Sequence, residues 1–119
     1  KERQDLGQAL AGVQTHIGAL VNYSMGSMQE PTEIYKTGFH TNTLLESLAE
    51  VVIAWLLLEH AEVALRKLPD AAGSDVAFYE GKIASARFFA SDALPKIPAR
   101  TAAAQEEDGW LMDFPDEAF

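Results

Sequence analysis

The chain has 119 residues, of which 48% are hydrophobic and 23% are charged, and it contains no cysteine. This composition is typical of a single soluble globular domain that is long enough to hold a core without metal or disulfide support. The lack of cysteine excludes disulfide frameworks, thiol nucleophiles and cysteine-based zinc sites, and it favours a cytoplasmic location.

Acidic residues outnumber basic residues by 18 to 9, so the formal net charge is -9 at pH 7. A surface of this sign repels phosphate groups, and nucleic acid is therefore not an expected partner. The longest apolar run, residues 51–58, is far shorter than the roughly 20 residues of a membrane span. No apolar signal block is present and the first residue is Lys1, so we expect a piece of a longer chain.

The first predicted element is an amphipathic helix over residues 2–27. Apolar side chains recur there at steps of three and four, which places them on one helix face: Leu6, Ala9, Leu10, Val13, Ile17, Leu20, Val21 and Met28. Each glycine inside it costs up to about 1 kcal/mol relative to alanine, so packing must hold the helix. These glycines are candidates for close helix approach: Gly7, Gly12 and Gly18.

Residues 29–42 contain a proline and a glycine without a sustained period, and they are predicted to connect two helices. A second helix is expected to begin at Thr43, which forms a capping box with Glu46. It should run for about 26 residues, until Pro69 prevents continuation. Its middle, VVIAWLLL, is apolar on every face, which predicts a central helix covered on all sides.

The composition of PDAAGSD predicts a turn, after which Ser74 or Asp75 is expected to cap a third helix. Apolar residues of that helix keep the spacing of three and four, with phenylalanines widening the stripe: Val76, Tyr79, Ile83, Ala86, Ala90 and Leu94.

Two prolines should make this helix kink or pause within residues 92–97. A final helical piece is expected over residues 99–107, ended by Gly109. The remaining residues, 110–119, alternate large apolar and acidic side chains, which favours an extended strap in a groove of the bundle or of a missing core. The predicted fold is therefore all-α: a bundle of three long helices and a short fourth over residues 1–109, followed by this tail.

No pattern in the sequence encodes a catalytic, cofactor-binding or metal site. The chain lacks the Glu-x-x-His spacing of di-iron bundles, the HExxH motif, glycine-rich phosphate loops and a nucleophile elbow. The nearest metal candidate combines Glu59 and Glu62 around His60. Surface ion pairs explain it better, with Glu62 pairing to Arg66 one turn further along the helix.

Three segments carry a resemblance to a known family: VVIAWLLLEHAEVALRKL, FYEGKIASARFFASDALPKIPAR and the ending LMDFPDEAF. From residue 44 onward the chain resembles the extra C-terminal domain of the longer bacterial acyl-CoA dehydrogenases, the branch that includes the methylmercaptopropionyl-CoA dehydrogenases. Residues 1–43 share with it only an amphipathic helix and a loop.

The resemblance implies a parent flavoprotein oxidoreductase of fatty acid metabolism, in which FAD accepts a hydride from the β carbon of an acyl-CoA after a glutamate removes the α proton. The family's flavin-contacting signature and catalytic glutamate belong to preceding core domains, and no segment here matches them. What the resemblance implies for this chain is a structural role. It would pack against the dehydrogenase core or a second subunit of a homo-oligomer, and it would shape the approach to the acyl-CoA channel.

The candidate interface residues lie in the YEGK run and in the tail: Tyr79, Glu80, Gly81, Lys82, Trp110, Phe114 and Phe119. Gly81 would let a neighbouring backbone come close, and Glu80 and Lys82 lie on divergent faces where each is available for a contact. The competing interpretation of these two charges is a solvated surface. For the whole chain, the alternative is a free-standing helical protein-interaction module whose acidic, aromatic tail docks a partner.

Overall fold

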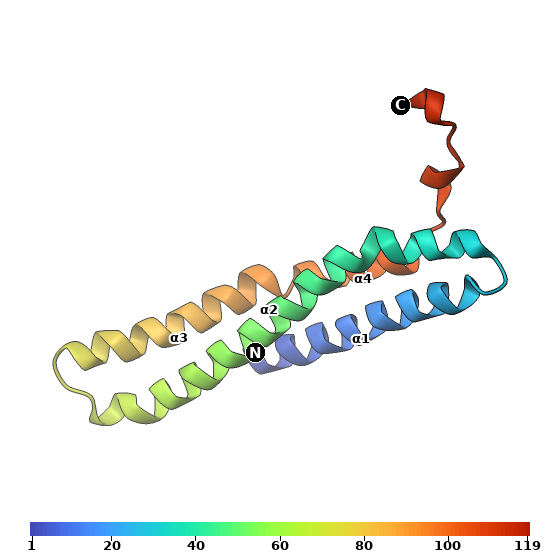
Figure 1. Ribbon diagram of the computed structural model, residues 1–119. Helices are drawn as coiled ribbons and strands as arrows, with labels where there is room; N and C mark the ends of the chain where they lie inside the picture. The colour runs from blue at the N-terminus through green and yellow to red at the C-terminus, as the bar shows by residue number, and fades with distance from the viewer.

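The computed structural model describes all 119 residues and confirms the all-α fold (Figure 1). The four helices are α1 (Glu2–Gly26), α2 (Ile34–Lys67), α3 (Ser74–Ala93) and α4 (Lys96–Gln105). Four short 3-10 turns accompany them: η1 (Pro31–Glu33), η2 (Leu68–Asp70), η3 (Trp110–Asp113) and η4 (Asp116–Ala118).

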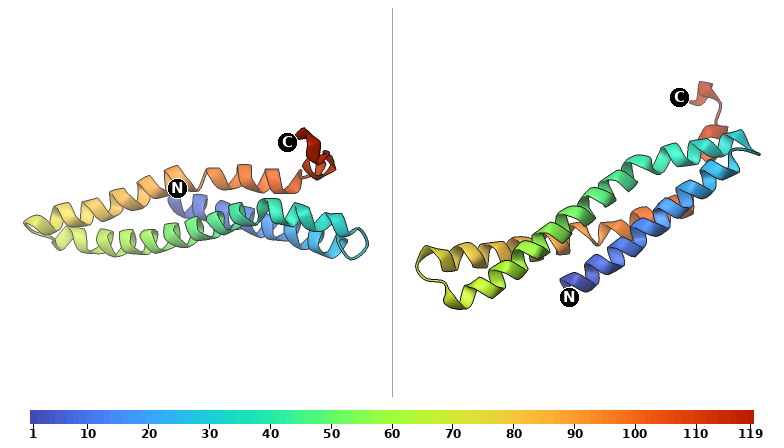
Figure 2. Two further views of the ribbon diagram at one scale, coloured as in Figure 1. Left: turned by 45° about the horizontal axis from the view of Figure 1, so that its top comes forward. Right: turned by 60° about the horizontal axis from the view of Figure 1, so that its bottom comes forward.

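The helices form an elongated rod that measures 66 × 29 × 17 Å. α1 and α2 make an antiparallel hairpin, and α3 returns along the second half of α2 (Figures 1 and 2). α4 continues nearly in the line of α3 and packs on α1 and the first half of α2. Because α1 begins beside the last third of α2, where Arg3 pairs with Glu62, the end of the α2–α3 hairpin is only two helices thick (Figure 1).

α1 agrees with its prediction, and one of its three glycines marks a close helix contact. A Cβ placed on Gly12 would lie 3.2 Å from Ile97 Cγ2 and 3.4 Å from Thr101 Oγ1, both on α4. The Thr101 hydroxyl also donates a hydrogen bond to the Gly12 carbonyl, at 3.0 Å. Gly7 and Gly18 have no such neighbour within 4 Å, so they do not mark a contact.

The predicted connection over residues 29–42 is wrong, because α2 already begins at Ile34. Thr43 lies inside the helix and donates to the carbonyl of His40 at 3.1 Å, so it caps nothing. Contacts with α1 explain the early start: the Thr37 hydroxyl donates to the Leu20 carbonyl across the hairpin, at 3.2 Å. Tertiary packing therefore overrides the weak helix propensity of this stretch. The helix ends at Lys67, before Pro69, as predicted.

The expectation that the middle of α2 is covered on all sides is also wrong. Val51 and Ala54 are buried, but four large neighbours are between 43% and 51% exposed: Val52, Ile53, Trp55 and Leu56. Only one side of α2 faces other helices of this chain, so the apolar residues on its other side remain in contact with solvent.

The core is narrow and consists mainly of small side chains. Only 16 of the 119 residues are buried, and the main cluster is formed by Ala9, Val13, Val51, Ala54, Ala90, Leu94 and Ile97. Alanine at the contacts lets helix axes come close together, but it removes little apolar surface from water. The rod is consequently thin, and large apolar side chains lie on its outside.

The two ends of α3 follow the prediction in part. Gly73, with a φ of 61°, is the N-cap residue, and no side chain bonds to the free amides, so capping by Ser74 or Asp75 is wrong. The predicted pause is confirmed, since α3 ends at Ala93 and α4 begins at Lys96, just after Pro95. Gly109 adopts a left-handed conformation, with a φ of 76°, and turns the chain into the tail beyond the end of α4.

The contact at Gly12 predicts opposite effects for two equivalent substitutions in α1. Gly12→Ala pushes a methyl group against the fully buried Ile97, whose surroundings leave it little room to move. Gly18→Ala meets open space and should stabilise the helix by up to about 1 kcal/mol. Thermal unfolding of both variants should therefore place Gly18→Ala above the unsubstituted chain and Gly12→Ala at or below it. Equal stabilisation by both would contradict the close approach.

Candidate functional site

Exposed apolar side chains gather on a face formed by α1 and α2. They repeat at helical spacing along both helices and are between 37% and 87% exposed: Leu10, Ile17, Val21 and Met25 on α1, Met28 just after its end, and Leu45, Leu48, Val52, Trp55 and Leu56 on α2. We call this surface the α1–α2 face. Contiguous apolar surface of this kind marks a contact with another protein surface.

Two grooves run along the junction of α1 and α2. One has a volume of about 380 Å³ and is almost entirely apolar: Ile17, Leu20, Val21, Ser24, Met25, Met28 and Leu44. The other, of about 360 Å³, lies nearer the start of α1 between Leu10 and Trp55. Methionine side chains adapt to irregular partner surfaces, and Trp55 offers a large apolar ring, so both grooves suit protein contacts.

The YEGK run lies on α3, near the α2–α3 turn. Tyr79 is half-buried against the hairpin, whereas Glu80, Gly81 and Lys82 are exposed. The Lys82 ammonium lies 5.2 Å from the centre of the Phe78 ring, a cation–π contact. No atom lies within 4 Å of a Cβ built on Gly81, so nothing in this chain uses the space that this glycine leaves open.

A small depression of about 250 Å³ brings part of this run together with the end of α2. It is lined by His60, Val63, Ala64, Phe78, Tyr79 and Lys82. Glu80 and Gly81 are not among these residues, so the structure separates the YEGK run into two parts. Tyr79 and Lys82 share a pocket, and Glu80 and Gly81 lie outside it.

The tail leaves the bundle at the end of α4 and points away from the helices (Figure 1). Its three candidate aromatics contact one another edge to face: the Trp110 and Phe114 ring centres are 5.3 Å apart, and those of Phe114 and Phe119 are 6.4 Å apart. Trp110 remains 56% exposed and Phe119 remains 85% exposed. The tail has two 3-10 turns, η3 and η4, so it is less extended than expected.

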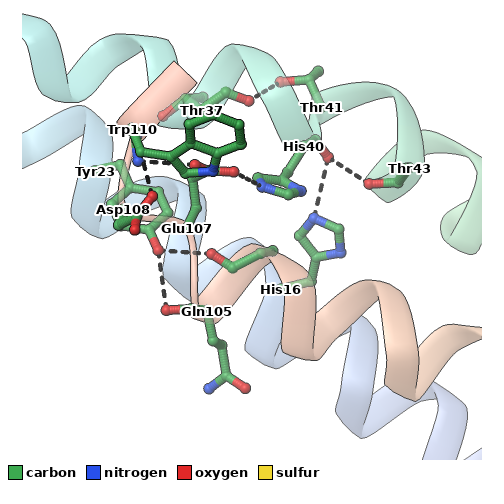
Figure 3. A network of polar contacts seen from close by, with 12 residues as sticks. His16, Tyr23, Thr37, His40, Thr41, Thr43, Gln105, Glu107, Asp108 and Trp110 are labelled. Carbon is green, nitrogen blue, oxygen red and sulfur yellow. Dashed lines mark hydrogen bonds and ion pairs between the residues drawn. The ribbon is translucent and has the colours of Figure 1, made fainter. Parts of the chain in front are cut away.

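A polar network fixes the start of the tail to α1 and α2 (Figure 3). The Glu107 carboxylate accepts a hydrogen bond from the Gly109 amide at 2.8 Å and lies 2.7 Å from Nε2 of His40. The Gly109 amide, followed by His40, holds the pKa of Glu107 below its usual value. On the neighbouring side, the Tyr23 hydroxyl donates to the carbonyl of Ala104 at 2.6 Å.

His16 occupies the interior end of this network and is completely buried. Its Nε2 lies 3.1 Å from the carbonyl oxygen of His40, which can only accept, so Nε2 carries the proton. The other ring nitrogen, Nδ1, has no partner. Burial lowers the pKa of His16 because a charged ring would hold an unpaired N–H in the interior.

A second polar cluster joins α4 to α2. Arg100 lies 2.6 Å from a carboxylate oxygen of Glu50 and 3.3 Å from Glu46, and it donates to the Ser47 hydroxyl at 3.2 Å. The hydrogen bond to Glu50 raises the pKa of the already basic guanidinium. This cluster gives α4 a fixed position on α2 and thereby also orients the start of the tail.

Sequence reasoning misses both polar clusters. It places His40 in a connection rather than in a helix, and Glu107 follows His40 by 67 positions, so no local pattern links the two. The predicted pair of Glu62 and Arg66 is not formed either. Glu62 pairs instead with Arg3 of α1, at 2.8 Å.

No group of three or more His, Asp or Glu side chains is arranged to hold a metal ion. None of the helices combines the length and the apolar character that a membrane crossing requires.

The narrow core, the exposed α1–α2 face and the projecting tail define an elongated all-α domain with much apolar surface. Comparison with known families gives its relationship: the model for the family described as acetyl-CoA dehydrogenase C-terminal like matches residues 1–115. The chain belongs to this family, and the match includes the first 43 residues, where the sequence resemblance is weakest.

Curated relatives agree with this assignment. The chain is 37% identical over 119 residues to the broad-specificity linear acyl-CoA dehydrogenase FadE5 of Mycobacterium tuberculosis (strain ATCC 25618 / H37Rv), covering 99% of this chain and 20% of that protein. It is 32% and 31% identical to two butyryl-CoA dehydrogenases of Syntrophomonas wolfei subsp. wolfei, covering 64% and 63% of this chain and 13% of each relative. The chain thus spans at most about a fifth of the length of these relatives.

Burial of neutral His16 predicts a specific pH dependence of stability. The unfolded chain binds a proton at this histidine near pH 6.5, whereas the folded chain does so only at lower pH. Stability is therefore lost as the pH falls below 6.5, with a slope of at most about 1.4 kcal/mol per pH unit. His16→Gln keeps a donor for the His40 carbonyl but does not titrate, so its unfolding free energy should fall less as the solution is acidified from neutral pH.

Denaturant unfolding at several pH values measures this difference. His60→Gln, which removes an exposed histidine, is the matched control and should retain the pH dependence of the unsubstituted chain. An unchanged slope in the His16→Gln variant would show that His16 is not the group responsible.

Proposed function

We propose that this chain is the C-terminal helical domain of a longer, FAD-dependent acyl-CoA dehydrogenase and that it packs against the catalytic core or a second subunit. The observation that carries this proposal is the exposed α1–α2 face. A helix face lined by valine, leucine, methionine and tryptophan is unfavourable in water, and covering it by another surface provides about 25 cal/mol for each Å² buried.

The family membership supplies the partner in this proposal. FadE5, which is named a broad-specificity linear acyl-CoA dehydrogenase, matches this chain over only 20% of its own length, so most of such an enzyme lies outside the matched region. A core that makes up the rest of the polypeptide is present at high effective concentration, which lets even a modest apolar face bind it.

No turn within residues 1–119 fits the pyrophosphate of the flavin in the Rossmann manner. A Rossmann-type dinucleotide site uses a glycine-rich loop whose amides face the pyrophosphate at a helix N-terminus. Here the turns before α2 and α4 contain Pro31 and Pro95, and the turn before α3 offers a single glycine of positive φ, Gly73. The chain's role in this enzyme is consequently to position and cover the catalytic domains, including the approach of the acyl-CoA.

The tail fits the same role. Its aromatic rings contact one another edge to face and remain exposed, and six acidic residues without a basic one lie within residues 101–119. We propose that Trp110, Phe114 and Phe119 contact the core or the second subunit of a homo-oligomer. The absence of cysteine is consistent with a cytoplasmic enzyme.

The proposal predicts that residues 1–119 and the complete gene product that contains them differ in flavin content and in activity. Purified residues 1–119 should carry no flavin, whereas the complete product should carry FAD and oxidise acyl-CoA with an artificial electron acceptor. Absorbance spectra and activity assays measure both properties. A complete product without flavin or dehydrogenase activity would refute this function and favour the free-standing interaction module.

If the α1–α2 face is an interface, a single charge placed on it should impair assembly of the complete enzyme without destabilising residues 1–119. Val52→Glu, at a position that is 48% exposed, should change the stability of residues 1–119 by no more than about 0.5 kcal/mol. In the complete protein it should lower flavin retention or dissociate subunits, because a carboxylate would be buried without a partner. Size-exclusion chromatography and flavin absorbance measure these losses.

Asn22→Glu provides the matched control, since Asn22 is exposed on α1 beside α4 rather than on the α1–α2 face. It should leave assembly and flavin content unchanged. Deletion of residues 110–119 should resemble Val52→Glu in the complete protein if the tail contributes to the same contact. Normal assembly of the Val52→Glu enzyme would contradict the proposed use of the face.

A further inference from the structure

The interface of α1 with α2 and α3 continues beyond the first residue of α1 as an open groove. The groove lies between the last third of α2 and the middle of α3. Beyond it, toward the α2–α3 turn, the rod is only two helices thick (Figures 1 and 2). Its volume is about 580 Å³, and its lining consists of Lys1, Glu2, Arg3, Leu58, Ala61, Glu62, Leu65, Ile83, Ala86 and Arg87.

The first turn of α1 is held at the end of this groove by both walls. Arg3 pairs with Glu62 of α2 at 2.8 Å, and Arg87 of α3 lies 3.5 Å from the carboxylate of Glu2. α1 therefore points along the groove, between the same two helices that form its walls.

The rows of apolar side chains that α1 covers in the core continue along both walls of the groove. On α2, one row of side chains at alternating steps of three and four runs through Val51, Ala54, Leu58, Ala61 and Leu65. Val51 and Ala54, in the main core cluster with Ala9 and Val13 of α1, are 9% and 1% exposed. Leu65, at the open end of the row, is 57% exposed.

α3 shows the same continuation. Its row runs from Ala90 in the core, through buried Ala86, to half-buried Ile83 at the groove. Both rows thus extend past the helix that would cover them. A row with core spacing on two adjacent helices indicates a third helix packed against both.

We infer that, in the complete polypeptide, the segment directly preceding Lys1 continues α1 as a helix and fills this groove. The inference rests on the proposed function in one respect, which is the presence of further chain outside residues 1–119. Continuity of the groove with the α1 interface identifies this segment as the occupant, because a helix extended from α1 enters the groove without a turn.

The ion pair between Arg3 and Glu62 sets the antiparallel register of the extension. Leu65 lies about one helical turn beyond Glu62, toward the α2–α3 turn. A continuation of α1 by the same distance beyond Arg3 places the first or second residue before Lys1 opposite Leu65. The occupant should be apolar on the side that faces Leu65 and Ile83. It should be polar at its edges, where Glu62 and Arg87 flank the groove.

Paired cysteines in the complete protein test this register, and residues 1–119 contribute no competing thiol. Leu65→Cys is combined with a cysteine at the first or at the second position before Lys1. The control combines the same upstream cysteines with Ser85→Cys, an exposed position of α3 outside the groove. After mild oxidation, peptide mass spectrometry should detect a cross-link in at least one of the Leu65→Cys pairs and in none of the Ser85→Cys pairs.

A second measurement uses the single variants. In the complete protein, the Leu65→Cys thiol should react with an aromatic disulfide reagent at least about tenfold more slowly than the Ser85→Cys thiol, because a packed helix exposes it only through local opening. Equal labelling rates without a cross-link would overturn the inference. Flavin content and dehydrogenase activity of the same preparations report the proposed function separately. An active flavoprotein with an open groove would contradict only this inference. An inactive protein without flavin but with a filled groove would contradict only the proposed function.

Discussion

The close approach of α1 and α4 at Gly12 is the contact on which the rest of the arrangement depends. Ile97 and Thr101 reach the backbone of α1 there because no side chain intervenes. This contact holds α4 across the α1–α2 hairpin, with Arg100 anchored to Glu50 on the other side. The end of α4 is thereby brought to the start of α2, where Glu107 meets His40. The position of the tail follows from a missing Cβ in α1.

Small side chains at the other helix contacts explain why the domain leaves so much of its apolar surface exposed. Alanine at half of the buried positions brings the helices close but leaves few large side chains to bury. The leucines, valines, methionines and tryptophans lie mostly on the outside. A rod of this kind leaves apolar surface for the partner proposed above, and its relatives in the family are several times longer.

The sequence is sufficient for the fold class, for α1, for the end of α2 and for the pause between α3 and α4, because periodicity and proline act locally. It is insufficient at the start of α2, where a proline, a glycine and threonines suggest a loop. Hydrogen bonds from Thr37 to α1 stabilise the helix there. Nor can the sequence alone show whether the apolar middle of α2 is buried within this chain. An all-apolar stretch does not reveal whether the surface that covers it belongs to the same chain. The polar clusters depend on pairs such as His40 and Glu107, which only the folded chain brings together.

The tail combines a fixed start with free side chains, and this combination favours binding. Glu107 and the Gly109 amide fix the direction in which the chain leaves the bundle, so little backbone freedom remains to be lost there on contact. The aromatic rings beyond it already contact one another edge to face, which restricts them further. Trp110 is 56% exposed and Phe119 is 85% exposed, so more than half of each side chain is available to a partner. A disordered acidic tail would lose much more entropy for the same contact. If the tail docks as proposed, the polar network around His40 therefore lowers the entropy cost of that contact.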